Sequence, residues 1–142
     1  MKELRKIGRK ERVRFPHWET SGMEAKIDTG AYTSSLHCKQ MKLNREAMRV
    51  QFVIPDPITG RIRDGVHVDT VIRDIRSVRS SNGLTEERVV VKTDIELGDR
   101  VYPIELTLTD RSAMRYPILL GRTFLTGRFL VDVSKRDILN KR

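Results

Sequence analysis

Short apolar segments separated by turn residues run along most of the chain. Several alternate apolar and polar residues or are rich in β-branched residues, which is the pattern of strands in an all-β fold. Residues 66–78 alternate only loosely. The side chains expected to point into the core there are Val66, Val68 and either Ile72 or Ile75. We predict a strand through His37 and Lys39, and strands over residues 9–15, 24–28, 48–54, 66–78, 88–97, 100–109 and 129–133.

Turn signals divide these segments. Asn82-Gly83 predicts a two-residue hairpin with a type I′ turn, because both residues readily take positive φ values. Gly98-Asp99 predicts another hairpin, and a short helix is expected over residues 122–126, where Gly127 ends it. No internal repeat or interdomain linker interrupts the pattern, so we predict a single domain over residues 1–142.

The first candidate chemistry is Asp28-Thr29-Gly30, which lies between apolar neighbours. The carboxylate of Asp28 can help to activate a water molecule. Thr29 supplies a short hydroxyl that can be buried and hydrogen-bonded near the turn, and Gly30 permits a close approach that a side chain would obstruct. The alternative is an aspartate that caps local amides in an ordinary turn.

A second segment, residues 116–122, lies much later in the chain. Its apolar residues run into a glycine and then into the predicted helix. An Asp-Thr-Gly followed by such a segment is the pattern of one pepsin-like lobe. We interpret Leu120, Gly121 and Arg122 as structural support of the catalytic turn, with Gly121 as a packing glycine.

These motifs resemble the retropepsin-like aspartic protease superfamily, and more closely a bacterial family labelled as ATP-dependent zinc proteases. The similar blocks span nearly the whole chain: Ile7-Gly8-Arg9, 25–31 with 33–37, 106–111, and 116–122 with 127–132. The resemblance implies an all-β, retropepsin-like closed barrel with a flap hairpin, one short helix and one catalytic aspartate per subunit.

In such a lobe, the hairpin between the aspartate turn and the closing apolar-Gly segment folds over the substrate. We assign residues 78–85 as the candidate flap, with Ser81, Asn82 and Gly83 as candidate substrate-binding residues. An ordinary exposed hairpin is the alternative, because Asn-Gly turns are common without any function.

Peptide hydrolysis by this chemistry needs two carboxylates that share one proton. The chain has one Asp-Thr-Gly, since Asp69-Thr70-Val71 carries a β-branched valine in place of the glycine. We therefore expect a symmetric homodimer in which Asp28 of both chains meet at the two-fold axis. We expect Thr29 to hydrogen-bond across this axis. Arg122 either buttresses the dimer interface, as in the retroviral pattern, or is a plain surface arginine.

The family's label mentions zinc and ATP, so we searched the sequence for residues that could coordinate a metal ion and for a loop that could bind phosphate. The nitrogen and sulfur candidates are His17, His37, His67 and Cys38, without a His-Glu-x-x-His or Cys-x-x-Cys motif. The adjacent His37 and Cys38 would point to opposite faces of a strand. No phosphate-binding Gly-x-x-x-x-Gly-Lys-Ser/Thr loop occurs. We therefore predict no metal and no cofactor, with any nucleotide dependence coming from a partner.

The chain of 142 residues carries 28 lysines and arginines against 19 acidic residues, a formal charge of +9. Such a surface attracts polyanions or simply serves solubility, and composition does not separate an acidic polypeptide from nucleic acid or ribosomes. One cysteine fits a reducing compartment. No apolar run has the length of a signal peptide or a membrane span, so we expect a cytoplasmic protein without membrane contact.

The leading hypothesis is a cytoplasmic, homodimeric aspartic-type endopeptidase that acts on acidic peptides or proteins. Relatives in the resembling family are often encoded beside, or fused to, ATP-grasp ligases that append glutamate, which implies trimming of glutamylated protein termini. The alternative is a noncatalytic binding module that recruits an acidic partner such as an ATP-grasp glutamate ligase or a ribosomal component. Nucleic-acid binding ranks last, because no RNA-binding motif is present and aromatic residues make up 6% of the chain.

Overall fold

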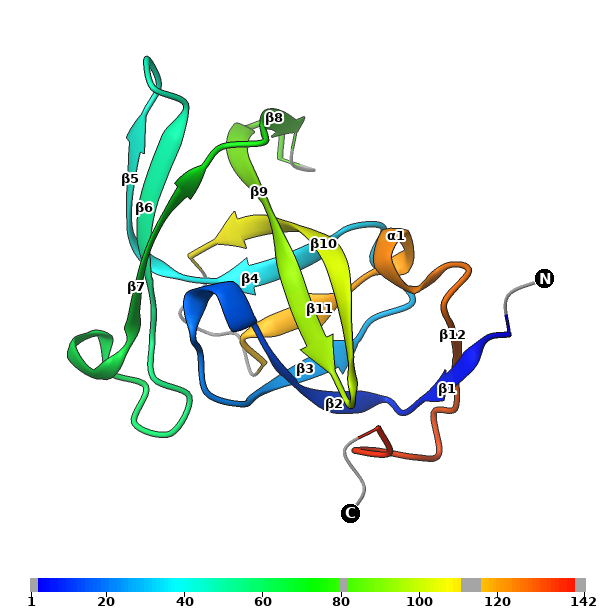
Figure 1. Ribbon diagram of the computed structural model, residues 1–142. Helices are drawn as coiled ribbons and strands as arrows, with labels where there is room; N and C mark the ends of the chain where they lie inside the picture. Colours follow the sequence, from blue (N-terminus) through cyan, green and yellow to red (C-terminus); the bar gives the residue numbers. More distant parts are fainter. Residues whose placement is uncertain (1–2, 80–81, 111–115, 140–142) are drawn as a thin grey trace.

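The computed structural model describes residues 3–79, 82–110 and 116–139. Strands dominate these residues (Figure 1). In chain order the elements are β1 (Arg5–Ile7), β2 (Lys10–Arg14), the 3-10 helix η1 (Pro16–Trp18), β3 (Met23–Ile27), β4 (Ser34–His37), β5 (Lys39–Asn44), β6 (Arg49–Ile54), the 3-10 helix η2 (Ile62–Asp64), β7 (Val66–Val71), β8 (Asp74–Arg79), β9 (Thr85–Leu97), β10 (Arg100–Thr109), β11 (Ile118–Leu120), α1 (Arg122–Leu125) and β12 (Phe129–Val131).

Six strands form a closed ring of backbone hydrogen bonds. Their order is β10-β4-β11-β3-β2-β9, and β9 pairs again with β10 to complete the circuit. Because the ring is closed, each of these six strands has a hydrogen-bonded neighbour on both sides for at least part of its length. Strands with paired edges are protected against pairing with other chains. The expected all-β fold with one short α-helix is confirmed, with strands joined in a closed ring.

The core fills the inside of this ring. Alternate residues of the ring strands point inward, as the period of two along a strand requires, and each fully buried aliphatic or aromatic side chain contributes roughly 1.5–3 kcal/mol. Among those with no exposed surface are Ile7, Phe15, Leu36, Val91, Ile95, Leu97, Leu106, Ile118 and Leu120.

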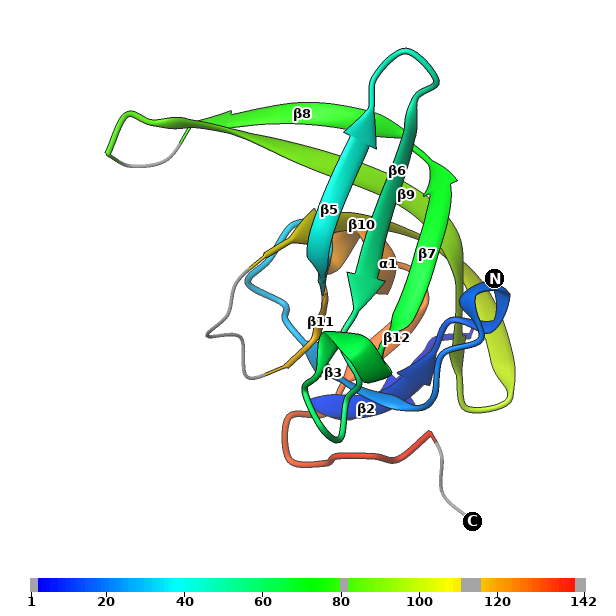
Figure 2. The ribbon, with the colours of Figure 1, turned by 90° about the vertical axis from the view of Figure 1, so that its left-hand side faces the viewer.

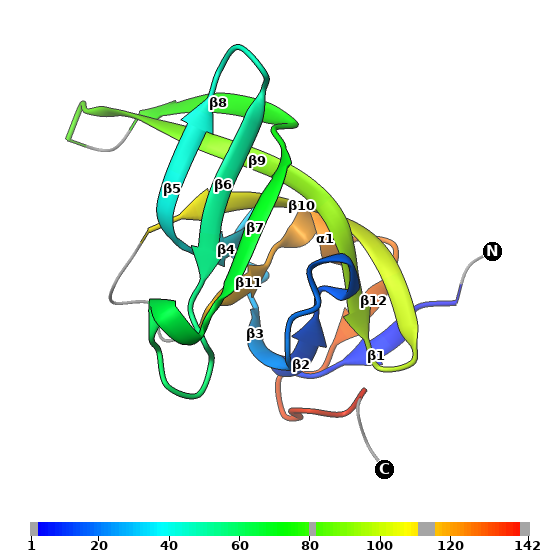
Figure 3. The same cartoon turned by 60° about the vertical axis from the view of Figure 1, so that its left-hand side comes forward.

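A second, three-stranded sheet, β5-β6-β7, stands beside the ring (Figures 2 and 3). Its inner face buries Val50, Phe52 and Val68. The ring of Trp18 lies between Phe15 and Phe52, with centroids 5.2 Å and 5.6 Å away, and so joins the two sheets. This sheet lies in the chain between β4 and β8, the strand that begins the candidate flap hairpin.

The prediction of one strand over residues 66–78 is wrong, because the chain changes sheets in the middle of it. The backbone N–H of Ile72 donates to the carbonyl of Met48, whereas the N–H of the next residue, Arg73, donates to the carbonyl of Val90. Consecutive residues therefore bond to different sheets, and β7 and β8 are separate strands.

The two ends of the described chain are tied to the ring. Strand β1 pairs in parallel with β12, as Figure 1 shows at one side of the molecule. Beyond β12, the backbone N–H groups of Ile138 and Leu139 donate to the carboxylate of Glu11, which also accepts from the N–H of Gly8 at 2.8 Å. Glu11 has no exposed surface. Within the described ranges, no helix is long and apolar enough to cross a membrane.

Candidate active site

Asp28 lies where strand β3 ends, and its backbone is held by strand β11. Strand β3 runs between β2 and β11, and the N–H of Asp28 donates to the carbonyl of Leu120 at 2.8 Å. The N–H of Gly30 donates to the carboxylate oxygen Oδ1 of Asp28 at 3.1 Å. The side chain is half-buried, so its carboxylate is oriented by the turn and still open to solvent.

The first residues of α1 brace the loop that follows this turn. The N–H of Arg122 donates to the carbonyl of Ala31, and the N–H of Thr123 donates to the carbonyl of Tyr32, both at 2.9 Å. The guanidinium of Arg122 donates to the carbonyl of Thr29 at 3.0 Å and lies 5.7 Å from the centre of the Tyr32 ring. Within the chain, Arg122 is therefore a support of the turn.

Gly121 is required by close packing. A Cβ atom at this position would lie 2.5 Å from the carbonyl oxygen of Thr33 and 2.9 Å from that of Ala31. The N–H of Gly121 donates to the hydroxyl of Ser34, which is almost fully buried, at 3.0 Å. Sequence reasoning did not select Ser34, although a small hydroxyl residue soon after the Asp-Thr-Gly turn was a usable signal.

Thr29 and Gly30 have open surroundings within a single chain. Thr29 is exposed, and its hydroxyl makes no hydrogen bond to any described residue. A Cβ atom at Gly30 would meet only Oδ1 of Asp28, at an ordinary contact distance of 3.4 Å. Within the described chain, the guanidinium of Arg122 contacts the carbonyl of Thr29, and the roles expected of Thr29 and Gly30 stay predictions.

The candidate flap is a hairpin of β8 and β9 that extends beyond the ring (Figure 2). The last pair described is Arg79 with Thr85, and this register does not fit the predicted two-residue turn at Asn82 and Gly83, which would pair residues 81 and 84. The side chain of Asn82 accepts a hydrogen bond from the N–H of Leu84 at 3.2 Å. Gly83 has a φ of +86°, and Ser81 lies outside the described residues.

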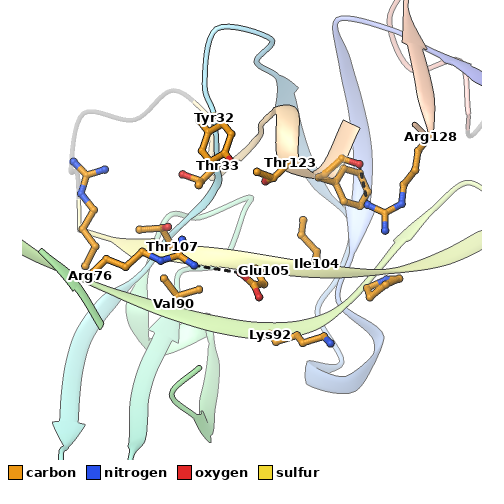
Figure 4. A pocket seen from close by; sticks show the side chains of 13 residues that line it. Tyr32, Thr33, Arg76, Val90, Lys92, Ile104, Glu105, Thr107, Thr123 and Arg128 are labelled. Atoms are coloured by element: carbon orange, nitrogen blue, oxygen red, sulfur yellow. Dashed lines mark hydrogen bonds and ion pairs between the residues drawn. The ribbon is translucent and has the colours of Figure 1, made fainter. Parts of the chain in front are cut away.

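A cavity of about 700 Å³ opens beside the turn (Figure 4). One wall comes from Tyr32 and Thr33, which follow the turn, and from the beginning of α1. The opposite wall comes from β8, β9 and β10. Asp28 does not line it. Its charged lining residues are one acid, Glu105, and four bases: Arg76, Arg88, Lys92 and Arg128.

Two other aspartates, Asp69 of the Asp69-Thr70-Val71 segment and Asp94, are engaged away from Asp28. Asp69 lies on β7 in the small sheet, where its carboxylate pairs with Arg49 of β6 at 3.0 Å. Asp94 lies on β9 and pairs with His17 at 2.7 Å. No hydrogen bond joins either aspartate to Asp28 in the described part of the chain.

The neighbours His37 and Cys38 differ in burial, which is consistent with side chains on opposite faces of an extended chain. Cys38 is fully buried, and burial raises the pKa of its thiol to about 12. Burial, followed by the nearby charge of Lys39, lowers the pKa of the half-buried His37. The described residues contain no group of three or more His, Cys, Asp or Glu side chains placed to hold a metal ion.

A family model described as "Retropepsin-like aspartic endopeptidase RimB" matches residues 6–142. Among curated proteins, a "Probable alpha-L-glutamate ligase" from Shewanella pealeana is 35% identical over 138 residues, which are 96% of this chain and 30% of that protein. A protein of the same description from Parasynechococcus marenigrum is 36% identical over 128 residues, which are 89% of this chain and 27% of that protein. The chain thus spans less than a third of these relatives.

Among solved structures, the Legionella pneumophila protein Lpg0085, described as having unknown function, is similar with a TM-score of 0.76. The match covers 96% of this chain and 99% of that one at 24% identity. At this identity the similarity demonstrates a shared fold and nothing more.

Proposed function

This chain belongs to the RimB-like family of retropepsin-like aspartic endopeptidases, and from that premise we propose that it hydrolyses peptide bonds as a symmetric homodimer. The observation that carries the proposal is the position of Asp28. Its carboxylate lies at a turn braced by Leu120, Gly121 and Arg122 and remains open to solvent.

The chemistry requires a pair of carboxylates that hold one proton between them. One carboxylate takes a proton from water as the water attacks the peptide carbonyl, and the protonated partner donates to the carbonyl oxygen. Like charges a few ångströms apart do not both ionise, which separates their apparent pKa values. In this proposal Asp28 of each subunit supplies one member of the pair.

The surface around Asp28 supports a symmetric arrangement. Thr29 is exposed, and among the described residues only the Asp28 carboxylate lies close to where a Cβ atom of Gly30 would be. A second copy related by a two-fold axis would cover both residues and bring the two turns together, because such an interface uses the same patch on both subunits. Thr29 would then donate its hydroxyl to the partner's turn.

The proposed substrate is an acidic polypeptide, in particular a protein terminus extended with glutamate. The net charge of +9 and the four bases of the neighbouring cavity favour acidic segments through long-range attraction. The relatives described as probable alpha-L-glutamate ligases contain a segment similar to this chain within a longer protein. A peptidase that removes glutamate would oppose a ligase that adds it.

The test is Asp28→Asn, which keeps the shape of the side chain and removes its ability to take a proton. We expect cleavage of a protein with a polyglutamate tail to fall by about a thousandfold, measured by mass spectrometry of the products. Asp69→Asn is the matched control and should leave the rate unchanged, since Asp69 pairs with Arg49 in the small sheet. Equal cleavage by wild type and Asp28→Asn would remove Asp28 from the mechanism.

The second candidate is a noncatalytic module that binds an acidic partner such as a glutamate ligase or a ribosomal component. The length of the relatives favours it, because a domain joined to a ligase can serve to position the ligase's substrate. It predicts salt-sensitive binding of acidic peptides without turnover by either wild type or Asp28→Asn. Cleavage of polyglutamate by wild type but not by Asp28→Asn would exclude this second candidate.

A further inference from the structure

We propose that Arg76, Arg88 and Lys92 form a carboxylate-binding subsite that holds an acidic residue of the peptide at a distance from the bond that is cut. The identity of the ligand rests on the proposed function, whereas the site itself rests on the geometry of the cavity beside the turn. Asp28 does not line this cavity, so its occupant is a substrate residue away from the scissile bond.

The first argument is the pairing of two arginines. Arg76 on β8 lies directly opposite Arg88 on β9 in the antiparallel ladder, and both line the cavity. Directly opposed residues have Cβ atoms about 5 Å apart, and like charges in such a pair destabilise the sheet. An anion bound between the two guanidinium groups would convert this repulsion into attraction.

The second argument is the incomplete pairing of Arg88. Its Nε is buried without a hydrogen-bond partner, and its ion pair with Glu86 is long, at 3.8 Å. Leaving a buried charged donor unpaired is costly. A guanidinium presents a planar fork that binds a carboxylate through two parallel hydrogen bonds, so a bound carboxylate would satisfy the donor that the chain leaves free.

The third argument concerns Lys92 and Glu105, which are cross-strand partners on β9 and β10. Arg88, Val90 and Lys92 alternate along β9 and line the same cavity. Glu105 reaches across to Arg76 at 3.5 Å (Figure 4) and to Arg73 at 3.5 Å. Lys92 has no ion pair with any described residue. Arg76 is thus shared with Glu105 and with Asp74, which it pairs with at 3.0 Å, whereas Arg88 and Lys92 carry the less compensated charges that a ligand would meet.

The lining favours a glutamate side chain as the occupant. Val90 and Ile104 place apolar atoms beside the bases, where they would contact the methylene groups of glutamate while its carboxylate meets the arginines. The cavity also begins at Tyr32 and Thr33, directly after the Asp28 turn. An extended peptide running from the turn along this wall would therefore deliver successive side chains to the subsite.

The experiment measures binding in an Asp28→Asn background, so that no peptide is consumed. Fluorescence anisotropy compares a hexaglutamate peptide with a hexaglutamine peptide at fixed salt. We expect clear preference for glutamate, and Arg88→Gln should weaken hexaglutamate binding about tenfold by removing charge-assisted hydrogen bonds. Lys92→Gln, at an exposed position, should weaken it less. Arg100→Gln changes the net charge equally outside the cavity and should have an effect within about twofold.

Glu105→Gln gives a prediction of opposite sign. Removing the acid that lines the cavity, and leaving Arg76 paired with Asp74 alone, should tighten hexaglutamate binding several-fold, whereas Glu46→Gln, an exposed acid away from the cavity, should change it little. Arg88→Gln should also leave the thermal unfolding midpoint unchanged or raise it, because it relieves the repulsion with Arg76. A purely structural arginine would instead lower the midpoint.

Three results would overturn the subsite: equal losses for Arg88→Gln and Arg100→Gln, equal binding of the two peptides, or tighter binding of a charge-matched oligonucleotide that Arg88→Gln weakens. The assay follows binding by a protein without the Asp28 carboxylate. It therefore tests the subsite independently of whether wild type cleaves peptides. Loss of the proposed peptidase function is therefore distinguishable from loss of the subsite.

Discussion

At the scale of single residues, Glu11 is buried although the charged residues around it in the sequence suggest an exposed position. It lies in the charged run Lys10-Glu11-Arg12, yet its carboxylate is fully buried and accepts backbone N–H groups from Gly8, Ile138 and Leu139. Two of these donors, Ile138 and Leu139, lie near the other end of the chain. No local sequence pattern around Glu11 therefore predicts these hydrogen bonds. Asp28 and Gly121 were predictable because their constraints produce a recurring motif, whereas the partners of Glu11 do not.

We expect Glu11→Gln to lower the free energy of unfolding by about 2–3 kcal/mol. The amide has one acceptor oxygen, and its NH₂ group would face N–H donors that the carboxylate now satisfies. Urea denaturation measures the change. Glu24→Gln, which breaks a more exposed pair with Lys10, should cost less than about 1 kcal/mol. Equal midpoints for Glu11→Gln and wild type would contradict this role.

At the scale of elements, the candidate site is an assembly of three short segments. The end of β3 carries Asp28, β11 accepts its backbone N–H, and the first turn of α1 holds the loop behind it. The segments were recognisable in the sequence because each is compact and locally patterned. The break near Ile72 and the wider loop around Asn82 were not, since they depend on which sheet each N–H reaches and on a side-chain hydrogen bond.

Gly121→Ala tests this assembly. The added methyl group would collide with the backbone of Thr33, which is fixed by its neighbours, and the resulting strain should destabilise the fold by about 1–3 kcal/mol and displace the turn. Thermal unfolding and peptide cleavage measure the two effects. Gly30→Ala is the matched comparison, because its methyl group meets only Asp28 Oδ1 at contact distance and should leave the unfolding midpoint unchanged. The same midpoint for both variants would refute the packing argument.

At the scale of the whole molecule, the closed ring of six strands accounts for the fold. One chain, however, supplies only Asp28 of the two carboxylates that the proposed chemistry needs. The alternation of strands and tight turns made an all-β fold predictable, and the family resemblance supplied its topology. The small sheet β5-β6-β7 was not foreseen as a separate layer, because its strands carry the same alternation as those of the ring. Whether two copies meet at Asp28 depends on a surface formed only after folding, which periodicity does not describe.

Mixing subunits distinguishes a dimeric enzyme from a monomeric one. Wild type and Asp28→Asn, combined in equal amounts and allowed to exchange, should retain about a quarter of the activity of the same total amount of wild type, since about a quarter of random dimers contain two intact carboxylates. A monomeric enzyme would retain about half. Asp69→Asn, mixed in the same way, should leave the activity unchanged. Sedimentation at the assay concentration verifies that dimers are present.

The bracing of the Asp28 turn also sets the time at which the site forms during translation. Asp28 emerges early, but the carbonyl of Leu120 and the N–H groups of Arg122 and Thr123, which hold the turn and its loop, emerge much later. A nascent chain that has not passed residue 123 therefore lacks part of the backbone bracing that holds the turn and its loop. The order of the segments along the chain thus completes the bracing of the turn only after most of the polypeptide has been made.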